Sequence, residues 1–329
     1  MWILGKYIDV TYPKVFYYRE LLEHCYISIH VTCTKRIQMP PNKEKKLGPL
    51  FGTVALLGLT LVLVDRQLSL TADQKMHGLC AITLVAVLVM FFSTEAIPQS
   101  LAYHNFADQR CLCCVPNTLD VLSNLPFAAV SAFGLDHVCG GKYLTSYFAV
   151  PPPAFINAEI ERPLWILWFV GIGLVSIGSG YYHWKPNNGR LVWDRLPMTI
   201  GFMAVLSTVI QETTGKASVG IVISLVIIGV TSVFYWHVTD DLRLYALVQF
   251  YSLSLLPLLM ILFPSPYKGA LPDYMCCLLL YIAAKIAESK DKQIFVFTGK
   301  RVSGHTIKHL LAGGATGWSS VMLIRRSPK

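Results

Sequence analysis

The sequence predicts an all-α, polytopic membrane protein with a core of seven transmembrane helices, preceded by one or two additional hydrophobic helices. Composition gives the first reason: of 329 residues, 54% are hydrophobic and only 14% are charged, whereas soluble domains carry about 25% charged residues. The second reason is a succession of apolar runs of ~20 residues, the length at which a helix crosses a bilayer. So few charges cannot cover a water-facing surface, and a soluble globular fold is therefore excluded.

The first part of the chain carries little chemistry of its own. Residues 1–46 contain scattered charges and lack the apolar core and cleavage site of a signal peptide, so we expect a poorly ordered extension. Apolar runs at 47–64 and 77–92 follow. A span needs about 17–25 residues, so the second run is short, and residues 47–94 are predicted to hold one or two extra transmembrane helices. A polar loop at 95–116 separates them from the core.

Seven further apolar runs define the predicted core, residues 117–324, before a basic tail at 325–329. Polar or proline-rich loops separate the runs, and lipid offers backbone groups no hydrogen-bonding partner, so each run is expected to be a helix. The runs cover residues 117–138, 164–182, 191–210, 217–236, 242–263, 272–289 and 303–324.

The net charge of +9 is concentrated beside the apolar runs. Basic residues gather at 35–46, at 285–301 and at 325–329, where anionic lipid headgroups are the expected partners, and no nucleic-acid partner is indicated. The last two segments fall on opposite sides of the membrane if the helices alternate, so the positive-inside rule leaves the orientation open. The nine cysteines show no zinc-finger spacing. Acylation of the loop cluster that begins at Cys111 is an alternative that remains open.

Five polar residues lie at the ends of three of these runs. Ser179 and His183 are one helical turn apart, as are His305 and His309, so each pair shares a helix face. Asp194 lies near the start of the run that follows His183. Alternation of the helices places all five residues on the side of the membrane where the first core helix begins, which we call the site face. The C-terminus then falls on the opposite side.

Three histidines on one side of a membrane suit a catalytic zinc ion, which takes three protein ligands and keeps one position for water. The predicted ligands are His183, His305 and His309. Asp194 is then placed to act as general base and later as acid, and Ser179 to donate a hydrogen bond to the water or to a developing oxyanion. A nucleophilic Ser179 is less suitable, because it lies at a helix end and not at a strand-to-helix elbow. Taken singly, Ser179 would be a helix-packing residue and Asp194 the ion-pair partner of Arg195.

The combination of Ser-x3-His, a following Asp and a late His-x3-His resembles the alkaline ceramidase family. That family belongs to a superfamily of seven-helix membrane hydrolases and receptors that also includes the adiponectin and progestin receptors. The resemblance implies a hydrolase of linear amide C–N bonds that cleaves ceramide to a sphingoid base and a fatty acid. It also implies that the three histidines bind Zn²⁺, that Asp194 transfers the proton and that Ser179 steadies the water or oxyanion.

The loop before the core and the first core helix resemble the bacterial and plant ceramidase-like branch of this family. The stretches that carry this resemblance are residues 106–110, 116–126 and 193–198. Well-studied eukaryotic relatives bind calcium through Asp-Trp-Cys-Glu, which here reads Asp-Gln-Arg-Cys from Asp108. Asp108, Asn117 and Asp120 retain oxygen ligands and make Ca²⁺ a candidate second cofactor, whereas Arg110 adds a positive charge. Helix capping and compensation of the helix dipole are the alternative roles of Asn117 and Asp120.

Two other functions stay open on the sequence. A receptor or lipid-sensing protein of the same fold would keep a structural zinc, which does not need a general base. A transporter would use the histidines as a proton relay and carry charges deep in several helices, where we find few apart from Glu212, Lys285 and Glu288 near helix ends. We expect a multi-pass integral membrane protein with a membrane lipid as substrate and no obligate protein partner. In a eukaryotic cell, the endoplasmic reticulum, the Golgi or another endomembrane is the expected location.

Overall fold

The computed structural model describes residues 48–329, in which the regular elements are all helices. The prediction of an all-α fold is confirmed, and the predicted N-terminal extension lies outside the described residues. Six helical segments are long and apolar enough to cross a membrane by length and composition, so the chain is a polytopic membrane protein. These segments are Ala72–Phe92, Thr118–Val138, Ala158–Trp184, Val219–Thr239, Arg243–Leu262 and Ala270–Ser289.

Two hydrophobic helices precede the core, α2 (Gly48–Leu68) and α3 (Ala72–Phe92). Helix α3 begins before the apolar run does, because Thr71 and Gln74 form a capping box: the Gln74 amide donates to Thr71 Oγ1 at 3.3 Å, and Gln74 Oε1 accepts from the Thr71 amide at 2.8 Å. Lys75 in this first turn pairs with Asp65 at 3.0 Å. The extra turn brings α3 to 21 residues, which is long enough to cross a bilayer.

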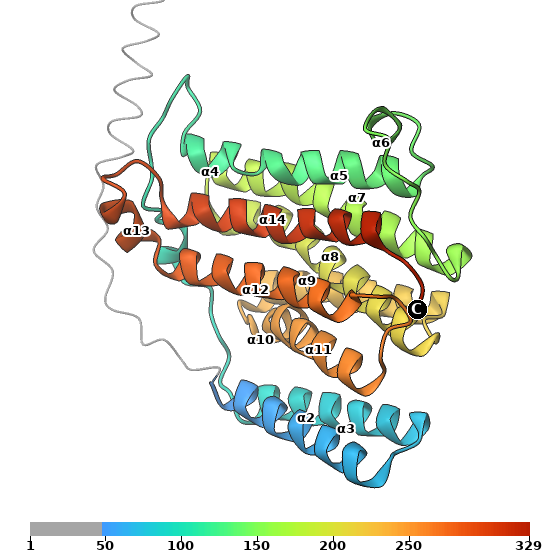
Figure 1. Cartoon of the computed structure of the whole chain (residues 1–329). Helices are drawn as coiled ribbons and strands as arrows, with labels where there is room; N and C mark the ends of the chain where they lie inside the picture. Colours follow the sequence, from blue (N-terminus) through green and yellow to red (C-terminus); the bar gives the residue numbers. More distant parts are fainter. Residues whose placement is uncertain (1–47) are drawn as a thin grey trace, which may run out of the picture. The chain divides into compact units, whose positions relative to one another are not determined.

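The core contains a helical segment at each of the seven predicted runs (Figure 1). The first is divided into α4 (Thr118–Leu122) and α5 (Leu125–Val138). The fifth is divided into α10 (Arg243–Ala246), the π-helix η2 (Leu247–Tyr251) and α11 (Ser252–Leu262). The other five are α7 (Ala158–Trp184), α8 (Asn188–Thr214), α9 (Val219–Thr239), α12 (Ala270–Ser289) and α14 (Gly304–Arg325). The connections contain η1 (Leu101–His104), α6 (Leu144–Tyr147) and α13 (Asp291–Phe297).

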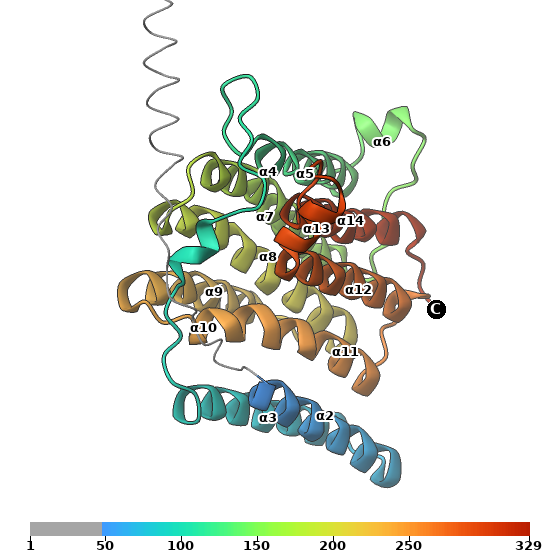
Figure 2. The same ribbon diagram turned by 90° about the vertical axis from the view of Figure 1, so that its left-hand side faces the viewer.

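Two glycines allow the helix ends that carry the predicted site residues to approach closely. A Cβ atom on Gly178 of α7 would lie 1.9 Å from the Trp193 carbonyl oxygen of α8. A Cβ atom on Gly304 of α14 would lie 2.3 Å from the Ala287 carbonyl oxygen of α12. Glycine is therefore required at both positions, because any side chain would force the backbones apart. Figure 2 shows the short helix α13 against these ends of α12 and α14.

A buried ionic cluster closes the opposite end of the core. Arg326, which directly follows α14, contacts Glu161 of α7 at 2.9 Å and Glu212 of α8 at 2.6 Å. Its guanidinium lies over the Tyr267 ring, 3.5 Å from the centroid. Burial, together with the hydrogen bond to Glu161, raises the pKa of Tyr267 to about 12. The three charged side chains are at most 4% exposed, so the cluster fixes the end of α14 to the two longest helices of the core.

Candidate metal centre

Three buried histidine side chains meet where α7 ends and α14 begins. His183 lies in the last turn of α7, and His305 and His309 lie one turn apart at the start of α14. One ring nitrogen from each residue lies within 4.8 Å of the others. Nε2 of His183 lies 3.3 Å from Nε2 of His305. The structure thus brings the three predicted ligands together.

This group of nitrogens could hold a metal ion, and one pair has the spacing that zinc ligands take. Zinc–nitrogen bonds are about 2.0–2.1 Å long, so two ligand nitrogens of a tetrahedral site lie roughly 3.3 Å apart, as His183 and His305 do. His309 is oriented through Nδ1, which lies 2.7 Å from the Ser123 hydroxyl, and its Nε2 is buried without a partner in the described part of the chain. An imidazole held through one nitrogen and bare at the other is the usual arrangement of a metal ligand.

Ser179 and Asp194 lie beside the histidines. Ser179 precedes His183 by one turn of α7, Asp194 lies near the start of α8, and the Ser179 hydroxyl lies beside the Asp194 carboxylate. The two side chains are 2% and 4% exposed, respectively. Both line a cavity that His309 also reaches. All five predicted site residues are therefore grouped around one place in the core.

Arg195 does not form the ion pair considered for Asp194 in the described range. Its Nη2 donates to Gln99 Oε1 at 2.6 Å. The aromatic rings of Trp236 and Tyr245 lie 4.2 and 4.7 Å from the guanidinium carbon. Asp194 therefore owes its position to α8 and to Ser179.

The three calcium candidates are each engaged with a different protein group. Both carboxylate oxygens of Asp108 contact Arg110, the closer pair at 2.6 Å. Asn117 Nδ2 donates to the His183 carbonyl oxygen at 2.8 Å, and Asp120 Oδ1 accepts from the Thr306 hydroxyl at 2.7 Å. Asn117 occupies the N-cap position of α4, but its side chain makes no capping bond there, and Asp120 lies in the first turn of the same helix. A calcium ion would have to displace Arg110 from Asp108, and calcium binding stays a prediction.

Two residues that the sequence analysis did not select also hold this site together. The Phe106 ring covers the rings of His183 and His305, with centroids 4.7 and 4.4 Å away. Asp291, at the start of α13, accepts from the backbone amides of His305 and Ala107, both at 2.8 Å. The sequence signals were the place of Phe106 in the stretch 106–110 that carries the family resemblance and the position of Asp291 between two predicted helices, because these contacts join segments far apart in the chain.

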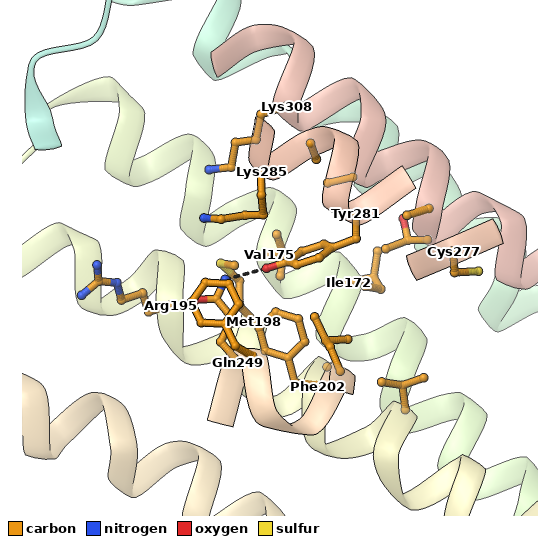
Figure 3. A pocket seen from close by; sticks show the side chains of 18 of the residues that line it. Ile172, Val175, Arg195, Met198, Phe202, Gln249, Cys277, Tyr281, Lys285 and Lys308 are labelled. Atoms are coloured by element: carbon orange, nitrogen blue, oxygen red, sulfur yellow. Dashed lines mark hydrogen bonds between the residues drawn. The ribbon is translucent and has the colours of Figure 1, made fainter. Parts of the chain in front are cut away.

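A cavity of about 310 Å³ extends from the site into the core. Its walls are mainly apolar, as the lining residues Ile172, Phe202 and Leu256 illustrate. On α12 the lining residues run from Tyr274 to Glu288, ~21 Å of helix at 1.5 Å per residue. The cavity is therefore long enough to take an extended acyl chain. Figure 3 shows part of its wall, including a hydrogen bond between Gln249 and Tyr281.

The end of the cavity near the histidines is polar. Glu288 accepts from the Tyr103 hydroxyl and pairs with the Lys308 ammonium, both at 3.2 Å, and it also pairs with Lys285. Lys308 Nζ lies 3.3 Å from His305 Nε2. Burial, with the Glu288 carboxylate, raises the pKa of Tyr103, so its hydroxyl stays a neutral donor near pH 7. Lys285, which the sequence places among the basic flanks, lines the cavity instead.

The fold and the site define a class: a polytopic helical membrane protein with a buried three-histidine group beside a serine and an aspartate in an apolar cavity. Comparison of the chain with protein-family models, with curated proteins and with solved structures gives no match. The function must therefore be argued from the site itself.

Proposed function

We propose that this protein is a zinc-dependent membrane amidase that hydrolyses ceramide, or a related lipid amide, to an amine such as a sphingoid base and a fatty acid. One observation carries the proposal: Ser179 and Asp194 are buried beside the three histidines and line the same apolar cavity. A metal kept only for structure would not need a carboxylate and a hydroxyl facing a cavity. The resemblance to alkaline ceramidases points the same way, and an endomembrane location in a eukaryotic cell belongs to the same proposal.

Each side chain around the proposed zinc site has its own role in the reaction. Zinc held by the three histidines would supply a Lewis acid and lower the pKa of water. Asp194 accepts a proton from the water as its oxygen adds to the carbonyl carbon, and passes that proton to the amide nitrogen as the C–N bond breaks. The Ser179 hydroxyl lies beside Asp194, and because a hydroxyl can rotate, it can turn to stabilise the carbonyl oxygen as negative charge develops.

The apolar part of the cavity would select the proposed substrate by the fit of its acyl chain along α12. Because the bilayer is as apolar as this wall, the chain gains van der Waals contacts there and not hydrophobic transfer energy. The same wall keeps bulk water away from the reacting carbonyl, which strengthens the electrostatic contacts made by Asp194 and Ser179. Acyl-chain length is therefore expected to govern affinity.

The test uses the whole chain purified into detergent or nanodiscs. Zinc is measured by elemental analysis, and fatty-acid release by mass spectrometry from ceramide, an N-acylethanolamine and an N-acylglycine. We expect about one zinc per chain and release from at least one amide. Both should be lost when His305 and His309 are replaced by alanine, and both retained in His237→Ala, whose histidine is exposed near the end of α9. Zinc-loaded protein that cleaves none of the amides would overturn the proposal and favour a lipid sensor with a structural metal.

A further inference from the structure

The polar end of the cavity holds more positive charge than the proposed chemistry uses. Lys285, Lys308 and Arg195 line the cavity, and we call these three side chains the cationic end. The carboxylates that line the same cavity are Asp194 and Glu288. Three cations therefore stand against two carboxylates, and one positive charge is left uncompensated.

The two lysines share one carboxylate. Lys308 lies 3.2 Å from Oε1 of Glu288, and Lys285 pairs with Oε2. The side chains of Lys308 and Glu288 are 13% exposed and that of Lys285 is 33% exposed, so water screens these charges only in part. Figure 3 shows both lysine side chains beside the cavity, one from α12 and one from α14. One carboxylate between two ammonium groups leaves a site that favours a second anion.

Arg195 adds a cation that has no carboxylate within ion-pairing distance in the described chain. Its partners are the Gln99 side-chain oxygen at 2.6 Å and the faces of Trp236 and Tyr245. Its Nη1 is buried and has no hydrogen-bond partner in residues 48–329. A buried charged donor without an acceptor is costly, so this end of the cavity is suited to a ligand that supplies an acceptor.

The place of these charges indicates which part of a lipid amide they face. Lys308 Nζ is 3.3 Å from Nε2 of His305, so an anion held by the lysines lies next to the metal centre. The acyl chain, on the carbonyl side of the amide, fits the apolar part of the cavity. An anionic group on the substrate must then lie on the amine side, a few bonds from the C–N bond that breaks.

We infer that the preferred substrate is an N-acyl amino acid, a lipid amide whose amine portion carries a carboxylate close to the nitrogen. The inference rests on the proposed amidase function and narrows its substrate class. A carboxylate complements the excess of positive charge on the cavity side chains, to which a bound zinc ion would add, whereas the head of ceramide offers only hydroxyl groups. Hydrolysis adds water across the C–N bond: the hydroxyl joins the acyl carbon, the proton goes to the nitrogen, and the products are a fatty acid and a free amino acid.

The test compares N-oleoylglycine with N-oleoylethanolamine, in which a hydroxymethyl group replaces the carboxylate. The ratio of the two kcat/KM values, measured in one preparation, is insensitive to partial loss of metal or fold. We expect the wild-type ratio to favour N-oleoylglycine by about tenfold or more, because hydrogen bonds to charged groups change affinity by roughly ten- to a hundredfold.

Three variants locate the source of that preference. Lys285→Met should lower the ratio about tenfold, and it leaves Glu288 paired with Lys308. Glu288→Gln removes a negative charge from the same cluster and should raise the ratio. Lys75→Met removes another partly buried lysine, paired with Asp65 at 3.0 Å and away from the cavity lining, and should leave the ratio unchanged.

The outcomes separate this inference from the amidase proposal. Cleavage of both amides with equal kcat/KM, or an unchanged ratio in Lys285→Met, overturns the inference and leaves the amidase proposal standing. Weaker inhibition by oleate in Lys285→Met with an unchanged ratio assigns the lysines to the fatty-acid product and also overturns it. If neither of these amides nor ceramide is cleaved, the amidase proposal fails, and displacement of a fluorescent fatty acid by each lipid then tests the anion site. A Lys285-dependent preference for N-oleoylglycine supports the anion site, and equal binding overturns it.

Discussion

Replacing Asp194 by asparagine tests the proposed proton transfer directly, because the exchange removes the basicity of one side chain and keeps its shape. Asp194 is 4% exposed and lies beside the Ser179 hydroxyl, which an amide oxygen of the same shape can face equally well. Packing and metal binding are therefore expected to survive. General acid–base catalysis contributes roughly 10²- to 10⁴-fold, equal to about 3–5 kcal/mol of the barrier. We expect Asp194→Asn to keep its metal and to lose amide hydrolysis by that factor.

The assay must report turnover per metal-loaded molecule, with the melting temperature as a check on the fold. Asp136→Asn is a control, because Asp136 likewise faces a hydroxyl, accepting from that of Thr145 at 2.9 Å, but lies near the C-terminal end of α5 and outside the cavity lining. It should keep full turnover. Full turnover in Asp194→Asn would refute proton transfer by this residue and strengthen the receptor or sensor explanation. Ser179→Ala, which removes one donor, should cost about one to three orders of magnitude.

Three further tests address the histidine cluster, the membrane topology and the buried ionic cluster around Arg326. Alanine at both His305 and His309 should reduce zinc from about one per chain to background in elemental analysis, and wild-type zinc would contradict the ligand assignment. Single cysteines at Lys292 and Lys329, in a variant without other cysteines, should be labelled from opposite sides of sealed vesicles; labelling from the same side would contradict the helix count. Arg326→Met should destabilise the fold by about 3–5 kcal/mol, because it leaves two buried carboxylates without their cation. Denaturant unfolding measures this, and a change under about 1 kcal/mol, the range of an exposed pair, would contradict it.

The hydrophobic helices could be predicted because their length and apolar composition follow from the bilayer itself. The start of α3 was missed because its first turn is polar, although the capping box of Thr71 and Gln74 is readable in a sequence. The π-helix Leu247–Tyr251 could not be predicted, because one widened turn changes neither composition nor length detectably. Helix α13 was missed because its basic neighbours resemble a membrane-flanking loop.

The residues of the candidate site also fall into two groups: those that spacing along one helix can reveal, and those whose position depends on how separate helices pack. His305 and His309 could be selected because their spacing places both on one face of a single helix. Lys308, three residues from His305, lies on a neighbouring part of that helix and could in principle have been selected with it. Glu288 could not be selected from the sequence, because its place in the cavity depends on the rotation of α12 against α14. Side-chain packing determines that rotation, and the apolar pattern of α12 does not.

Three polar residues that lie next to the histidine cluster in space satisfy backbone and hydroxyl groups at the helix ends that carry the histidines. Every helix leaves carbonyl groups at its end and amides at its start without partners within the helix, and buried groups of this kind need other partners. Asn117 donates to the carbonyl oxygen of His183 in the last turn of α7, and Asp291 accepts from the amide of His305 in the first turn of α14. Asp120 binds the hydroxyl groups at the start of that same helix. Because a zinc site needs its ligands on fixed backbone, these polar contacts position the histidines whether or not any of the three residues ever binds a cation.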